Sequence, residues 1–180
     1  MRSVTKDVFY HIYNRGINSC NIFSHPENKR YFLEKLKQHL SDVVTVYAYS
    51  LMDNHFHLVI KTNNEQLVTQ KLSNFFNAYA KAFNKQENRT GSLFEKHFRR
   101  IRLEKEDYLK NVILYIHLNP KKHLNIDFTS YKFSSYQTII SQRETKIARD
   151  EVINLFETVE NFVNSHQTYQ DNLIEDFTFE

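Results

Sequence analysis

Residues 43–61 read VVTVYAYSLMDNHFHLVIK, and this stretch decides the fold. Its two ends are rich in β-branched and aromatic residues, which is typical of strands. Between them lie Met52, Asp53 and Asn54, and Asp and Asn favour turns because their side chains bond to the nearby backbone. The stretch therefore predicts a β-hairpin whose second strand begins at His55.

The pattern on either side of the hairpin predicts an α+β fold. Residues 8–14 and 93–103 have strand character, whereas apolar residues recur at helical spacing in 26–40, 65–84 and 105–118. The third helix is expected to end at Asn119-Pro120, because a proline disfavours helical geometry in the residue before it. This order predicts a ferredoxin-like split βαβ sheet with an added C-terminal helix, followed by a helical acidic tail.

The charges are distributed unevenly along the 180 residues. Residues 1–148 hold 23 Lys and Arg against 13 Asp and Glu, a net +10, whereas residues 149–180 hold 1 against 8, a net −7. We interpret 1–148 as the functional domain and 149–180 as an acidic helical extension. A basic body of this kind favours a polyanionic partner, although an ordinary charged surface gives the same excess.

The composition points to a soluble cytoplasmic protein. The N-terminus lacks the unbroken apolar stretch of a signal peptide, and no later run has the length of a membrane span. A single cysteine, Cys20, excludes an intramolecular disulfide and fits a reducing compartment.

His55 and His57 form a His-x-His pair inside the predicted strand 55–61. Side chains alternate across a strand, so both imidazoles point to one face while Phe56 points to the other. Two imidazole nitrogens on one face can hold a divalent cation. A pair of ordinary, partly buried histidines gives the same pattern, and the pair alone does not decide between the two.

Tyr115 lies on the third predicted helix, at the edge of its apolar stripe, with Asn119 one turn further on the same side. This placement predicts a tyrosine whose hydroxyl faces a cleft. The alternative is a packing residue, since the chain has 11 tyrosines.

Three separated motifs resemble those of a known family. They are Tyr10-His11-Ile12-Tyr13-Asn14-Arg15-Gly16, Met52-Asp53-Asn54-His55-Phe56-His57-Leu58 and Tyr115-Ile116-His117-Leu118-Asn119-Pro120. In order and spacing they resemble the REP-associated tyrosine transposases, which belong to the HUH single-strand transposases. The resemblance covers about residues 8–140 and departs from the family at Lys121–Asn125, where a small, glycine-containing segment is expected.

The resemblance implies an enzyme, a metal-dependent DNA endonuclease and strand transferase. Tyr115 is then the nucleophile that forms a 5′-phosphotyrosine, and His55, His57 and Asn119 hold Mg²⁺ or Mn²⁺. The ordinary pKa of tyrosine, about 10, leaves little phenolate at neutral pH, so the cation would favour the phenolate and polarise the phosphate. The expected substrate is single-stranded or hairpin DNA, bound by a monomer or homodimer. The cationic residues expected to contact its phosphates are Arg15, Lys96, Arg99, Arg100 and Arg102.

Two other functions stay open at this level. One is a nucleic-acid-binding module of the same fold without catalysis. The other is a metal-dependent phosphodiesterase that uses a metal-activated water, in which Tyr115 only orients the substrate. The acidic tail likewise has two interpretations, as a helical extension that stabilises the domain or as an intramolecular competitor of DNA.

Overall fold

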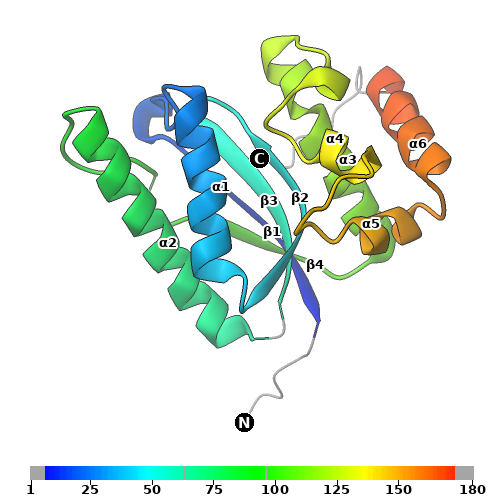
Figure 1. Ribbon diagram of the computed structural model, residues 1–180, viewed down its shortest axis with the longest axis horizontal. Helices are drawn as coiled ribbons and strands as arrows, with labels where there is room; N and C mark the ends of the chain where they lie inside the picture. The colour runs from blue at the N-terminus through cyan, green and yellow to red at the C-terminus, as the bar shows by residue number, and fades with distance from the viewer. Residues whose placement is uncertain (1–6, 63, 96, 173–180) are drawn as a thin grey trace.

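The computed structural model describes residues 7–62, 64–95 and 97–172 (Figure 1). The strands are β1 (Val8–Arg15), β2 (Val44–Leu51), β3 (His55–Thr62) and β4 (Arg99–Leu103). The helices are α1 (Pro26–Leu40), α2 (Glu65–Gln86), α3 (Glu106–Leu124), α4 (Tyr136–Ile140), α5 (Arg149–Leu155) and α6 (Val159–Asn172), with short 3-10 turns η1 (Ile17–Ser19) and η2 (Phe128–Ser130). No helix in the described part of the chain is long and apolar enough to span a membrane.

The four strands form one antiparallel sheet in the order β2-β3-β1-β4. This is the order of a ferredoxin-like split βαβ sheet, so the predicted fold class is confirmed. Helices α1 and α2 cover one face of the sheet, and α3 to α6 lie on the other (Figure 1). The predicted hairpin is β2 and β3, closed by a bond from the Met52 amide to the His55 carbonyl of 2.9 Å.

Local sequence accounts for the helix starts. Pro26 occupies the first turn of α1, where its missing N–H is not needed. The side chain of Asn64 caps α2 by accepting from the Leu67 amide at 3.0 Å.

The face under α1 and α2 is an apolar core. Alternate residues of β1 and β3 pack there against both helices: Tyr10, Ile12, Phe56, Leu58 and Ile60 from the strands, and Phe32, Leu36, Leu72 and Phe75 from the helices. The opposite face carries Phe9, His11, Tyr13, His55, His57 and Val59, because residues two apart in a strand share a face.

Strand β2 contains a bulge between Val46 and Ala48. Val46 pairs with Ile60, but Ala48 pairs with Val59, so Tyr47 is the extra residue. The bulge places Tyr47 and Ala48 in the core under α3, while Val46 packs in the core under α1 and α2.

Two predicted boundaries are wrong. Strand β4 begins at Arg99 rather than Leu93, because His97 adopts a left-handed backbone (φ 61°) that interrupts the extended run. Helix α3 continues past Pro120 to Leu124 and ends where Asn125 turns left-handed (φ 53°). All residues from Val112 to Pro120 are buried, and this packing outweighs the ~3 kcal/mol cost of an internal proline.

Of the C-terminal helices, α6 packs against α3 and α5 packs against β2. Val152, Phe156 and Phe162 are buried in the same apolar cluster as Leu109, Val112 and Ile116. Glu151 adds an ion pair to Lys61 of β3, with 2.8 Å between Nζ and the carboxylate, and a hydrogen bond from the Tyr47 hydroxyl.

Candidate metal and nucleophile site

The candidate site lies between α3 and the sheet face that carries the histidines. The Cα partners of His55 and His57 on β1 are Arg15 and Tyr13. The imidazole rings of His55 and His57 lie 5.2 Å apart between centroids, nearly perpendicular. Both predicted metal ligands therefore share one face, as their spacing requires.

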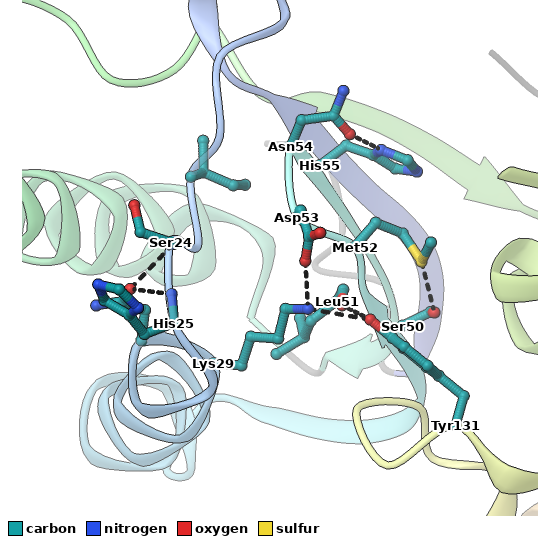
Figure 2. A network of polar contacts seen from close by, with 12 residues as sticks. Ser24, His25, Lys29, Ser50, Leu51, Met52, Asp53, Asn54, His55 and Tyr131 are labelled. Carbon is teal, nitrogen blue, oxygen red and sulfur yellow. Dashed lines mark hydrogen bonds and ion pairs between the residues drawn. The ribbon is translucent and has the colours of Figure 1, made fainter. Parts of the chain in front are cut away.

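His55 is held between two amide side chains. Its Nδ1 lies 2.7 Å from Oδ1 of Asn54, a contact seen in Figure 2. Its Nε2 lies 3.2 Å from Oδ1 of Asn119 on α3. If Nδ1 donates its proton to Asn54, the lone pair of Nε2 points to the side where Asn119 presents its oxygen.

His57 is buried. Its Nδ1 lies 2.9 Å from Nε2 of His11 on β1. Burial, together with the nearby His11, His55, His123 and Arg15, holds the pKa of His57 well below its usual value. Burial also lowers the pKa of His11 to about 3. Both rings are therefore neutral at physiological pH, which is the state in which imidazole binds a metal.

Tyr115 meets this group from α3. Its ring is edge-on to His57 at 5.6 Å between centroids, and Nζ of Lys122 lies 5.4 Å from its ring centroid. The expectation that Tyr115 lies at the edge of an apolar stripe is wrong, because its exposed fraction is 1%. The reason is that its ring is enclosed between α3 and the sheet, where it packs with His57 and the apolar cluster that includes Val59.

Asn119 links the nucleophile candidate to the metal-ligand candidates. Its Nδ2 donates to the Tyr115 carbonyl at 3.0 Å, which leaves Oδ1 directed at Nε2 of His55. Adjacent ligands of an octahedral ion with bonds of 2.0–2.1 Å lie ~3 Å apart, close to the 3.2 Å between these two atoms.

Two imidazoles and one amide oxygen suit a divalent cation that keeps open positions. Among the described residues there is no group of three or more His, Cys, Asp or Glu side chains that could hold a metal. Two histidines and one amide would not complete a closed structural zinc site, and they would leave positions for water or phosphate oxygens.

A polar network supports the loop before His55 from the far side of the sheet (Figure 2). The buried Lys29 of α1 donates to Asp53 at 2.7 Å and to the Tyr131 hydroxyl at 3.1 Å. Tyr131 in turn donates to the Leu51 carbonyl at 2.7 Å. The Lys29 ammonium group also lies 5.1 Å from the ring centroid of Phe133. This network fixes the turn from which His55 projects.

Gly16 aligns the end of β1 with the same turn. Its amide donates to the Asn54 carbonyl at 2.8 Å. A Cβ atom at this position would lie 2.0 Å from the Cys20 carbonyl oxygen, so only glycine fits.

The predicted DNA-contacting cations do not form one surface. Arg15 and Arg99 lie on the histidine face, since they pair with His55 and Tyr13. Arg100 and Arg102 lie on the opposite face. There Arg100 stacks on Tyr10 at 5.0 Å and donates to Thr69 at 2.8 Å. Lys96 lies outside the described residues.

A groove of about 870 Å³ lies on that opposite side, between α2 and the segment before β4. Phe76, Phe94 and Phe98 line it together with Lys81 and Arg100. Phe94 and Phe98 also pack against Phe76, so they contribute to the core whether or not they contact a ligand. The groove is separate from the histidine site.

Sequence reasoning gave no role to His11, Tyr13, Lys122 or His123, which the structure places around the site. His11 and Tyr13 repeat the i, i+2 alternation of His55 and His57, and that signal could have identified them. The His123 ring lies 4.9 Å from the His55 ring, a contact that exists only because α3 continues past Pro120.

Comparison with known proteins supports the fold. A solved structure of a REP-associated tyrosine transposase bound to a REP hairpin matches with a TM-score of 0.57 and 16% sequence identity, covering 79% of this chain and 84% of that one. No family model and no curated protein matches the sequence. At this identity the likeness defines a shared mixed α/β fold with a four-stranded antiparallel sheet.

Proposed function

We propose that this protein is a metal-dependent, single-tyrosine DNA endonuclease and strand transferase that acts on single-stranded or hairpin DNA. The observation that carries the proposal is the convergence of His55, His57, Asn119 and Tyr115, which come from two elements that are far apart in the sequence. The fold neighbour, a tyrosine transposase bound to a hairpin, supports the same class of substrate.

In this proposal His55, His57 and Asn119 hold Mg²⁺ or Mn²⁺. When bound, the cation would neutralise charge on the scissile phosphate and favour the deprotonated nucleophile. His55 and His57 supply neutral nitrogen ligands, and Asn119 fixes the distance between the metal ligands and Tyr115 by its bond to the Tyr115 carbonyl.

The Tyr115 oxygen would then attack the phosphorus and lose its proton. A new phosphorus–oxygen bond forms to tyrosine, the bond to the 3′ oxygen breaks, and that oxygen gains a proton. The product is a 5′-phosphotyrosine and a free 3′-hydroxyl, and attack by another 3′-hydroxyl reverses the step without ATP. Lys122 lies close enough to stabilise the negative charge that develops there.

Arg15 and Arg99 are the cations best placed to bind the DNA backbone at this site, because they lie on the histidine face. Arg100, Arg102 and Lys96 are proposed to contact DNA outside the reacting centre. Phe94 and Phe98 would stack on unpaired bases in the groove beside Arg100.

The enclosure of Tyr115 favours one alternative, a phosphodiesterase in which a metal-activated water attacks. A tyrosine with an exposed fraction of 1% reaches a phosphate only if a covering side chain moves. Lys122, which is exposed and lies over the ring, is a side chain able to do so.

The test uses a 3′-labelled hairpin oligonucleotide with a single-stranded flank, incubated with Mg²⁺ or Mn²⁺ and separated on a denaturing gel. The label stays with the fragment whose 5′ phosphate is attached to tyrosine. We expect a covalent adduct with the wild type and none with Tyr115→Phe, whose stability should change by less than about 1 kcal/mol. Tyr108→Phe is the matched control on the same helix.

Each other outcome points to a different function. Cleavage without an adduct supports the phosphodiesterase, and a shift in a native gel without cleavage supports a binding module. An adduct that persists in Tyr115→Phe and disappears in Tyr108→Phe would move the nucleophile to Tyr108.

A further inference from the structure

His11 is the buried residue closest to the candidate metal ligands that the proposed reaction does not use. It lies at the middle of β1 with an exposed fraction of 0%, so its ring is shielded from solvent. Its ring is stacked on His57 at 5.1 Å and on Tyr13 at 4.8 Å. Its cross-strand neighbours, Val59 and Ile101, are apolar.

Packing alone does not account for a histidine at this place. An aromatic or branched apolar side chain would fill the same volume without the cost of burying two polar nitrogens. Among the described residues, the hydrogen bond of His11 is the 2.9 Å contact between its Nε2 and Nδ1 of His57. Its own Nδ1 is buried without a hydrogen-bond partner in that part of the chain. The polar character of His11 is therefore directed at His57.

The contact has two neutral arrangements with opposite consequences. If Nε2 of His11 carries the proton, it donates to Nδ1 of His57, and the proton of His57 must sit on Nε2, which then cannot bind a metal. If Nδ1 of His57 carries the proton, it donates to Nε2 of His11, and the lone pair of Nε2 of His57 is available to a cation.

We propose that His11 is a positioning residue for the metal site, which accepts the Nδ1 proton of His57 and so directs Nε2 of His57 at the cation. This inference rests on the proposed function, because it requires a metal at His55 and His57. Asn54 acts in the same way on His55, by accepting from its Nδ1 at 2.7 Å. The two ligands are thus each fixed by a residue that does not touch the metal.

The first test is Mn²⁺ affinity, measured by calorimetry at neutral pH on four folded proteins: wild type, His11→Phe, His11→Gln and Tyr13→Phe. His11→Phe keeps the ring and removes the acceptor, and we expect it to weaken Mn²⁺ binding by about 10–100-fold. Glutamine places an amide oxygen near the position of Nε2, so His11→Gln should restore affinity to within a few-fold of the wild type. Tyr13→Phe, which keeps the stacking ring, should bind Mn²⁺ as the wild type does.

The second test reads the proton directly. In ¹⁵N-labelled protein with Mg²⁺, two-bond ¹H–¹⁵N correlations should show His57 protonated at Nδ1 in the wild type. A His57 ring protonated at Nε2 in that complex would overturn the inference, as would His11→Phe binding Mn²⁺ with wild-type affinity. A wild type that binds Mn²⁺ no better than His55→Ala would instead overturn the proposed metal site, and this inference with it.

Discussion

The two faces of the sheet are formed by alternate residues of the same two strands, β1 and β3, yet they bury different kinds of side chain. The face under α1 and α2 buries phenylalanine, leucine and isoleucine, with Phe32, Phe56 and Phe75 at its centre. The face under α3 buries His11 and His57 next to Tyr115. Burying apolar groups stabilises a fold, whereas burying imidazoles costs free energy unless they are bonded. We infer that the apolar face under α1 and α2 stabilises the fold and so offsets the cost of burying the histidines on the face under α3.

The neighbours His55 and Phe56 give the sharpest test of this comparison, because they lie on opposite faces of β3. His55→Ala removes a partly exposed side chain, so the melting temperature should stay nearly unchanged. It also removes a proposed metal ligand, so cleavage should fall roughly 10³-fold or more. Cleavage rates across a Mn²⁺ titration check this, and a wild-type rate at any metal concentration would contradict the metal site.

Removal of residues after Arg149 tests whether the histidine face depends on its outer cover. The truncation exposes the cluster into which Val152, Phe156 and Phe162 pack. At about 1.5–3 kcal/mol per side chain the loss is roughly 5–9 kcal/mol, comparable with the whole stability of a typical domain. We expect a truncated chain that is unfolded or melts far lower, measured by circular dichroism.

The truncation also tests the tail as a competitor of DNA. Competition predicts a folded truncated protein that binds a hairpin more tightly at low salt, with the gain shrinking as salt rises. That result would refute the stabilising role.

Phe56→Ala is the counterpart of His55→Ala on the apolar face. Phe56 is fully buried between Phe32 and Phe76, and its truncation should lower the free energy of unfolding by ~3–5 kcal/mol. Denaturant titration measures this. The folded fraction should still cleave at the wild-type rate, and a specific loss of Mn²⁺ affinity in Phe56→Ala would show that the two faces are not separable.

Acid should weaken the contact between α3 and α6, which belongs to the α3 side of the sheet. His117 of α3 and His166 of α6 are buried and 2.8 Å apart between ring nitrogens, and burial lowers the pKa of His166 to about 4. In the unfolded chain histidine takes up its proton near pH 6.5, before the folded protein does, so stability is lost as the pH falls from about 6.5 to about 4. The loss from His166 is roughly 3 kcal/mol. Melting temperatures between pH 7 and 4 should fall less steeply in His166→Gln.

The elements that could be predicted from the sequence are those with a strong apolar period. Helix α1 begins and ends as predicted, and the hairpin of β2 and β3 follows from its turn residues. The end of α3 could not be predicted, because local geometry disfavours a helix before Pro120 while burial by distant segments decides the outcome.

The candidate site was predicted as far as alternation within one strand allows. His55 and His57 share a face, as alternation predicts, and Asn119 lies beside His55, whereas their binding of a metal stays a prediction. The pairing of His11 with His57 could not be predicted, because it depends on the register between strands 46 residues apart. Likewise the bond from Lys29 to Tyr131 joins residues 102 apart, and no spacing rule indicates it.

The bulge in β2 determines where this strand can gain or lose a residue. Even-numbered side chains of β2 point to the α1 and α2 face before the extra residue Tyr47 and to the histidine face after it. Ser50 therefore lies opposite His57. Deleting Tyr47 would straighten the ladder and keep both the pairing of Val44 with Thr62 and the pairing of Ser50 with His57, at the loss of one side chain from the core under α3. The bulge is thus the place where β2 can lose one residue without a change of register, whereas an insertion into the regular part of the strand would turn every side chain beyond it to the other face.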